Sequence, residues 1–310
     1  MNPAASPLAV VIPTHDRRAI LERTVGALAA QSDLDFRLIV VDDGSSDGTW
    51  EWLQATAAVL TRPQLEIVRQ ENRGQGQARN RGLQLAGDGL VLFLGDDVIA
   101  CRDLVAEHRR AHATATSPRA VVGFIDWRRT EMRVTPALEM VNREGHQFGF
   151  AHMRPGEAVP FTCFYTSNLS LPRELLGNDP FDAAFQSYGW EDVELGYRLD
   201  RRGVKLYYHP AAAAEHLHPM TLTDLFARQR AAGRGIHGLL DLHPELAGDS
   251  RLSPIDAPRW FAAGRHAIPP LVPLLSRLDR LGVPLGKRLL HRVLICGYYL
   301  GRDEARGVAA

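Results

Sequence analysis

The apolar run Leu90–Leu94 ends abruptly in a glycine and two carboxylates, Asp96 and Asp97. The run is too short to span a membrane and is typical of a strand buried on both faces. Ligands of open α/β sheets bind where the strands end. Two adjacent carboxylates at that point need a compensating positive charge, such as a divalent metal carrying a phosphate-bearing substrate. We therefore expect a ligand site at the end of this strand.

Strand-like and helix-like stretches alternate along the first hundred residues. Three successive strand–helix units favour a parallel, doubly wound sheet. Beyond residue 120 the pattern loosens, and from residue 221 the chain is expected to be helical. The predicted strands are 8–13, 36–41, 65–68, 90–94, 121–125, 161–165 and 204–208, and the predicted helices are 19–31, 49–60, 74–85 and 191–201.

Composition excludes few function classes. The chain has 36 basic and 36 acidic residues, so general nucleic-acid binding is not expected. Its three cysteines are far apart and lack metal spacing, which favours a reducing compartment. No apolar run reaches 18 residues, and Met1–Pro7 lacks a signal-peptide pattern. We expect a cytoplasmic protein, or one held at a membrane from its cytoplasmic side.

Polar residues also follow the first two predicted strands. Thr14, Asp16 and Arg17 follow the first, and Asp42 and Asp43 follow the second. Carboxylates there can accept hydrogen bonds from a ribose or from the imide N–H of a pyrimidine. Turn formation and helix capping explain the same residues without a ligand.

The segment Asn72–Asn80 combines glycines with arginines at the start of the predicted helix 74–85. Glycine allows close approach, helix N-termini present amide groups, and Arg79 could pair with a phosphate. The segment matches neither a Walker motif nor a Rossmann fingerprint, so it is a weak signal by itself.

An aromatic–acidic cluster, Tyr188–Asp192, spans the start of the predicted helix 191–201. Trp190 could stack on a sugar ring, and a carboxylate of Glu191 or Asp192 could take a proton from an acceptor hydroxyl. The alternative is an ordinary helix start, where the macrodipole favours acids.

His216 and His218 lie two residues apart, so on a strand both face the same side. One of them could complete the ligand shell of a metal. A structural role or a solvated loop is the alternative.

In this order the motifs resemble those of the family 2 glycosyltransferases, which have the GT-A fold. Val11–Arg17 is similar to the family's opening strand and turn, and Val40–Asp47 closely resembles its second motif. Asn72–Asn80 is similar to the third motif. Gly95–Asp97 falls where the metal-binding Asp-x-Asp belongs, and Glu191–Asp192 falls where the acceptor-site acidic pair belongs.

The resemblance runs from about residue 8 to residue 218 and implies an α/β GT-A fold. That fold is a Rossmann-like, mixed but mostly parallel sheet flanked by helices. It implies a glycosyltransferase domain over 1–220, with a nucleotide-sugar-binding half (1–118) and an acceptor half (119–220). A helical C-terminal extension over 221–310 would follow.

The resemblance also implies a donor site for a nucleotide-diphosphate sugar, with a UDP-sugar favoured. Asp43 would contact the base, and Asp96 would lie near the ribose or the donor sugar. The other residues expected in this pocket are Pro13, Thr14, Asp16, Arg17, Asp42, Gly74 and Arg79.

For the acceptor, the resemblance implies that Asp192 is the catalytic base. It would deprotonate the acceptor hydroxyl as that oxygen attacks the anomeric carbon, and this single displacement inverts the configuration. Glu191 would orient the acceptor or hold Asp192, and Trp190 would line the acceptor site. The acceptor would belong to a glycan, a glycolipid or another lipid-linked molecule, or a polysaccharide.

A divalent metal, Mn²⁺ or Mg²⁺, is implied at Asp97, with His218 as the first histidine candidate and His216 as the second. Gly95 replaces the first acid of the usual motif, so one expected carboxylate is missing. Metal binding would then depend on Asp97 and a histidine.

Two alternatives to a transferase stay open. A sugar-phosphate nucleotidyltransferase would need an N-terminal Gly-rich loop for the triphosphate, which Pro13–Asp16 lacks. A non-catalytic nucleotide-binding scaffold would retain the fold without the acidic residues Asp43, Asp97 and Asp192, which are all present here.

The segment 265–302 is basic and rich in leucine, with Asp279 as its only acid. Such helices can lie on an anionic membrane surface, where a lipid-linked acceptor would be found. The alternative is a helical appendage packed on the catalytic domain with a solvated basic face.

Overall fold

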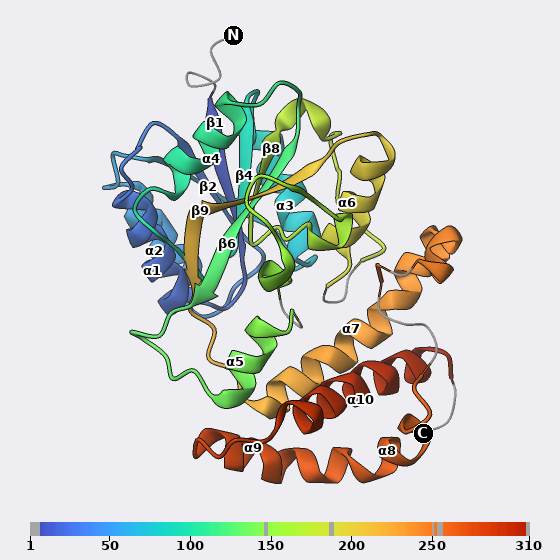
Figure 1. Cartoon of the computed structure of the whole chain (residues 1–310). Coiled ribbons are helices and arrows are strands. Elements are labelled where there is room, and N and C mark those ends of the chain that lie inside the picture. The colour runs from blue at the N-terminus through green and yellow to red at the C-terminus, as the bar shows by residue number, and fades with distance from the viewer. Residues whose placement is uncertain (1–6, 146–147, 186–188, 250, 253–256, 308–310) are drawn as a thin grey trace. The chain divides into compact units, whose positions relative to one another are not determined.

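A computed structural model describes residues 7–145, 148–185, 189–249, 251–252 and 257–307 (Figure 1). Tyr188 and nearly all of the Met1–Pro7 segment lie outside them. The chain forms two compact units. The first contains Met1–Glu131, Met153–Gln186 and Leu195–His218, and the second contains Met132–His152, Ser187–Glu194 and Pro219–Ala310. The predicted division after residue 220 stays a prediction, because compactness does not test which segments fold independently.

The first unit is built on one mixed sheet. Among the described residues nine strands join it, in the order β3-β2-β1-β4-β8-β6-β9-β5, with β7 paired to β9. The strands are β1 (Leu8–Thr14), β2 (Arg37–Asp42), β3 (Gln64–Arg69), β4 (Leu90–Leu94), β5 (Val98–Ala100), β6 (Ala120–Trp127), β7 (Ala158–Val159), β8 (Asn168–Pro172) and β9 (Leu206–His216). The helices are α1 (Arg18–Ala29), α2 (Thr49–Ala57), α3 (Gln75–Ala86) and α4 (Leu104–Ala113), while α6 (Glu191–Arg201) spans both units.

The parallel half of the sheet, β3-β2-β1-β4, confirms the predicted strand–helix alternation. All five residues of β4 are buried, as the apolar run predicted. In the β1–β2 register Thr14 pairs with Asp42, so these two strands end level with each other. The polar residues that follow β1, β2 and β4 therefore lie at the same edge of the sheet.

The strand predicted at 161–165 is wrong. Residues Phe161–Cys163 form a short 3₁₀ helix, and the strand is β8, which runs antiparallel to β4 and β6. Its sequence alternates polar and apolar residues, with Asn168 and Ser170 as the polar ones, and such a pattern predicts that these two side chains face solvent. Both are fully buried and are bonded by His108 and His112 of α4, at 2.8 Å in each contact.

The second unit is helical, as predicted for the chain beyond residue 221. It contains α5 (Pro136–Arg143), α7 (Leu222–Leu242), α8 (Phe261–Ala267), α9 (Val272–Arg280) and α10 (Lys287–Ala305). Its short 3₁₀ helices are Phe150–His152, Pro244–Gly248 and Pro269–Leu271, while Arg173–Leu175 belongs to the first unit. None of the helices in the described part of the chain is long and apolar enough to cross a membrane.

Helices α7 and α10 lie side by side at very short range (Figure 1). A Cβ on Gly233 would lie 1.9 Å from the carbonyl oxygen of Tyr298, and one on Gly301 would lie 1.8 Å from that of Arg230. Only glycine permits this approach. The apolar residues Leu290, Val293 and Leu294 of α10 are buried in the core of this unit.

Candidate functional site

The turn after β4 presents two buried acids. A hydrogen bond from Val98 N to the Gly95 carbonyl (3.2 Å) closes this turn, which leads from β4 to β5. Asp96 and Asp97 are only 7% and 9% exposed. They are therefore not the solvated acids of an ordinary surface turn, and their charges require partners within the protein.

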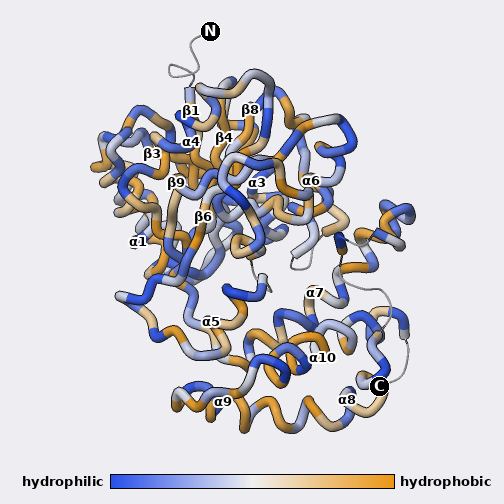
Figure 2. The backbone as a smooth tube through the Cα atoms, viewed as in Figure 1, coloured by the Kyte–Doolittle hydropathy of each residue, from blue (hydrophilic) through white to orange (hydrophobic). Residues whose placement is uncertain are grey.

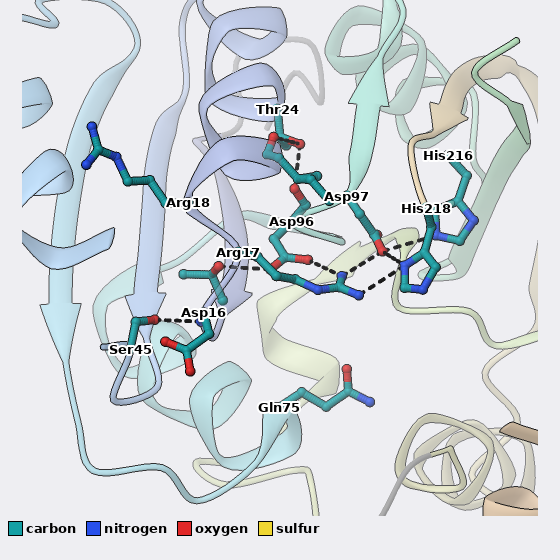
Figure 3. A network of polar contacts seen from close by, with 12 residues as sticks. Asp16, Arg17, Arg18, Thr24, Ser45, Gln75, Asp96, Asp97, His216 and His218 are labelled. Carbon is teal, nitrogen blue, oxygen red and sulfur yellow. Dashed lines mark hydrogen bonds and ion pairs between the residues drawn. The ribbon is translucent and has the colours of Figure 1, made fainter. Parts of the chain in front are cut away.

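Three nitrogen atoms contact one carboxylate oxygen of Asp97, Oδ2 (Figure 3). Nδ1 of His218 and Nη1 of Arg17 both lie 2.7 Å from it, and Nε2 of His216 lies 3.2 Å from it. Both histidines thus face the same side, as their spacing predicted. The Leu217 amide also donates to the Asp97 carbonyl (2.8 Å), which fastens this turn to the end of β9.

Asp96 is held by groups from β1 and α1. Its Oδ2 accepts from the Thr14 hydroxyl (2.8 Å), and its Oδ1 accepts from Nη1 of Arg17 (3.0 Å). The Thr24 hydroxyl donates to its carbonyl (2.6 Å). Thr24 is buried in the middle of α1 and has no sequence signal that distinguishes it from other core threonines.

The two carboxyl groups have pKa values shifted in opposite directions. Burial raises the pKa of Asp96, and the adjacent Asp97 carboxylate raises it further. The positive charge of Arg17 lowers this pKa but does not cancel the rise. Burial also acts to raise the pKa of Asp97. His216 and His218, together with Arg17, outweigh it and hold that pKa well below its usual value. Asp97 is therefore the carboxylate that stays ionised and can ligate a cation.

Asp97, His216 and His218 fit a divalent metal. Each offers one ligand atom, and these atoms lie within 4.8 Å of one another. Nδ1 of His218 lies 2.7 Å from Oδ2 of Asp97 and 3.0 Å from Nη2 of Arg17. The carboxylate oxygen requires a donor and the guanidinium requires an acceptor, and one ring nitrogen cannot be both at once. A cation at the place of the guanidinium would be a partner for both Oδ2 and Nδ1. One carboxylate with two imidazoles favours Mn²⁺ over Mg²⁺, which prefers oxygen ligands.

Gly95 leaves little room for the acid that the usual motif has there. A Cβ at Gly95 would lie 3.0 Å from Oδ1 of Asp97 and 3.0 Å from Cγ2 of Val98. An aspartate at this position would therefore have to move the Asp97 side chain. The local packing therefore disfavours a second carboxylate at this position, besides the charge that it would add.

The acids after β2 make hydrogen bonds within the protein. Asp43 accepts from the side chain of Gln70 (2.7 Å) and from the amides of Arg73 and Gly74 (2.9 Å each), so it fixes the start of α3. Asp42 is fully buried and accepts from the Ser45 amide (2.9 Å). Three hydrogen bonds leave Asp43 with capacity for about one more donor.

Asp16 lies in the neighbouring turn with a positive φ of 50°. Its amide donates to the Ser45 hydroxyl (2.9 Å), and its Oδ1 accepts from the Ser46 amide (2.6 Å) (Figure 3). That backbone hydrogen bond lowers the pKa of its exposed carboxyl group. The turns after β1 and β2 are therefore joined to each other.

Pro13 and Arg79 are both buried in the first unit. Pro13 pairs with Val41 in the β1–β2 ladder, so it shapes the strand end. Arg79 lies on α3, 5.5 Å over the ring of Phe181, and donates to Gln75. Neighbouring Asn80 exchanges two hydrogen bonds with the Phe181 backbone, a role that nothing in the sequence indicates.

Trp190, Glu191 and Asp192 belong to the second unit, at the start of α6. The indole N–H of Trp190 donates to the Ala232 carbonyl of α7 (2.8 Å). Glu191 is buried, and its carboxylate accepts from the Gly189 amide (3.2 Å). The acidic pair thus begins the helix, as the macrodipole favours, and Trp190 is anchored within its own unit.

The chain is similar in sequence to known proteins. The family described as "Glycosyl transferase family 2" matches residues 9–168. The chain is 34% identical over 224 residues to validoxylamine A glucosyltransferase of Streptomyces hygroscopicus subsp. jinggangensis, covering 64% of this chain and 52% of that protein. The chain spans about half the length of the curated relatives it matches.

Two solved structures share the fold. One is a mannosyltransferase from Pyrobaculum calidifontis in complex with GDP-Man and Mn²⁺, with a TM-score of 0.63 and 18% identity, covering 98% of this chain and 89% of that one. The other is residues 1–349 of TarS from S. aureus in complex with UDP, with a TM-score of 0.53 and 16% identity, covering 97% and 91%. At these identities the likeness confirms the predicted GT-A fold alone.

Proposed function

The chain belongs to glycosyl transferase family 2, and from this premise we propose that it transfers a sugar from a nucleotide-diphosphate sugar to an acceptor hydroxyl. The observation that carries the proposal is the cluster at the strand ends, in which the buried Asp97 and His216 meet the partly exposed His218 and Arg17. This cluster has the ligands for a divalent cation and a guanidinium suited to a diphosphate.

In this proposal Asp97, His216 and His218 hold Mn²⁺, with Mg²⁺ as the less suited ion. When bound, the cation supplies positive charge that stabilises the departing diphosphate. Arg17 exchanges its contact with Asp97 for one with a diphosphate oxygen. Asp96, anchored by Thr14, lies on the side of the ribose or the donor sugar.

The nucleotide occupies the edge formed by the turns after β1 and β2. Asp43 accepts the imide N–H of a uracil with its remaining capacity, which is why a UDP-sugar is preferred as the donor. Pro13, Asp16, Asp42 and Gly74 shape this edge, and Arg79 supports it through α3. One neighbour of the same fold binds UDP and another binds GDP-Man, so the fold itself does not decide the base.

The acceptor half of the reaction is assigned to the start of α6. Asp192 takes the proton as the acceptor oxygen bonds to the anomeric carbon and the bond from that carbon to the diphosphate breaks, so the configuration inverts. Glu191 holds this helix start, and Trp190 lines the acceptor site. The acceptor is proposed to be a glycan, a lipid-linked molecule or a polysaccharide, reached from the cytoplasmic side.

Calorimetric titration with UDP, GDP, dTDP and CDP, each with Mn²⁺ and then with EDTA, tests the donor half. Selective, Mn²⁺-dependent binding of UDP is the expected result. Selective binding of another diphosphate would correct the base, and binding that ignores EDTA would remove the metal. No binding of any of the four would overturn the donor site, whereas nucleotide binding without sugar transfer would favour the scaffold alternative, which the names of the relatives do not favour.

A further inference from the structure

The exposed apolar side chains of this protein gather on one short stretch. Among the described residues, seven large hydrophobic side chains are exposed, and only Val59 and Leu242 lie elsewhere. Single exposed apolar residues are ordinary, but five within nineteen residues require an explanation. These residues run from the 3₁₀ helix before α9 to the first turn of α10, and they are Leu271, Leu274, Leu281, Val283 and Leu289.

The orientation of helix α9 leaves Leu274 and the following Leu281 exposed. Val272, Ser276 and Asp279 form one face at helical spacing and are buried. Asp279 fixes this orientation, because it is fully buried and its carboxylate accepts from the Ala137 amide of α5 (2.8 Å). Leu274 and Leu281 lie on the opposite side, 57% and 68% exposed (Figure 2 shows the hydropathy along α9).

The exposed charges of the same stretch are all positive. The only acid between residues 271 and 292 is Asp279, which is fully buried. Lys287 makes an ion pair with Glu144 (2.6 Å), and Arg292 lies over the ring of Trp260. The other exposed bases are Arg277, Arg280 and Arg288.

We propose that residues 271–292 form a membrane-contact surface that binds bilayers containing anionic lipids. The exposed leucines enter the boundary between headgroups and acyl chains, while the arginines extend to the lipid phosphates. The charge decides for a lipid surface, since an apolar stripe with basic borders and no exposed acid complements an anionic bilayer. In this proposal α9 lies in the plane of the bilayer surface. This inference does not depend on the transfer reaction.

Co-sedimentation of the full chain with lipid vesicles tests it. The protein is expected to bind phosphatidylcholine vesicles that contain phosphatidylglycerol, more weakly as salt is raised. The double variant Leu274→Ser/Leu281→Ser should lower the affinity by about tenfold for each leucine. Arg277→Gln/Arg280→Gln should lower it by about fivefold for each arginine and reduce its salt dependence.

Val59→Ser and Leu242→Ser are the matched controls, because they remove exposed apolar residues (74% and 42%) elsewhere and should leave vesicle binding unchanged. Circular dichroism and nucleotide calorimetry on the same samples verify the fold and separate this test from that of the donor site. Absence of vesicle binding, or an equal loss in the controls, would overturn the proposal. So would a dimer that Leu274→Ser/Leu281→Ser converts to a monomer without any effect of lipid, since the surface would then join two copies.

Discussion

Nη1 of Arg17 lies 2.7 Å from Oδ2 of Asp97, the same oxygen that the two histidines approach. The guanidinium therefore holds the oxygen that a metal would need. Arg17 also bonds Asp96, so one positive group now balances two buried carboxylates. Metal binding at Oδ2 must break the contact between Arg17 and Asp97. The guanidinium of Arg17 is then free beside the place proposed for the diphosphate.

Arg17→Gln is expected to raise the affinity for Mn²⁺ in the absence of nucleotide by about tenfold. The variant removes a charge-assisted hydrogen bond that competes for Asp97, and such bonds contribute about 1.5–3 kcal/mol. Titration calorimetry with MnCl₂ measures the effect. Arg18→Gln is the control, because Arg18 bonds Glu22 on the exposed side of α1. Weaker Mn²⁺ binding in Arg17→Gln would mean that the guanidinium supports the metal site.

Gly95→Ala is expected to weaken Mn²⁺ binding several-fold, because the added Cβ would lie 3.0 Å from Oδ1 of Asp97 and displace that carboxylate. The same titration measures it. Gly177→Ala serves as the control, since a Cβ there meets nothing within 4 Å. Unchanged or tighter binding in Gly95→Ala would show that Asp97 adapts without loss.

Asp192→Asn is expected to lower the rate of sugar transfer by about a thousandfold and to leave nucleotide affinity unchanged, because a general base acts on the acceptor alone. Transfer is followed by release of the nucleotide diphosphate, and affinity by calorimetry. Asp200→Asn, at the other end of α6 where Asp200 pairs with Lys205, should leave both unchanged. Equal losses of transfer rate and nucleotide affinity would contradict the assignment of Asp192 as the base.

The first unit is expected to lose stability as the pH falls below about 6.5. Burial lowers the pKa of His108 to about 3, and burial together with Arg119 lowers that of His112 to about 4. Both histidines stay neutral in the folded protein but take up protons when it unfolds. The unfolded chain therefore binds more protons at pH values between these lowered pKa values and the ordinary histidine value of about 6.5. Each should reduce the free energy of unfolding by about 1.4 kcal/mol per pH unit in that window.

Urea unfolding between pH 7.5 and pH 5 measures this slope. His112→Gln should flatten it, whereas His15→Gln, at an exposed histidine of the same unit, should leave it unchanged. A slope near zero in the unaltered protein would contradict the prediction.

Sequence predicted the fold best where its signals are local. Helix α6 begins and ends as expected, because its apolar spacing and acidic start lie within eleven residues. Strand β8 was misplaced because its polar residues are stabilised by His108 and His112, some sixty residues earlier in the chain. A pattern read along the chain contains no trace of that pairing. Helices α4 and α5 were not predicted either.

The site followed the same division. Asp97, His216 and His218 were expected together, and the structure brings their ligand atoms within 4.8 Å. Arg17 was expected in the nucleotide pocket, but its position between the two acids depends on a contact across eighty residues. The roles assigned to Asp43, Asp192 and Trp190 stay predictions.

The sequence by itself determined the parallel strands, the acidic strand ends and the family motifs, because each depends on residues close together in the chain. Only the tertiary structure decided that Asp97 stays ionised while the pKa of Asp96 rises, and that Leu274 and Leu281 are exposed while Leu290 and Leu294 are buried. These properties depend on the charges, donors and apolar surfaces that folding brings next to a residue. Neighbours of that kind come from distant parts of the chain, where no local pattern encodes them.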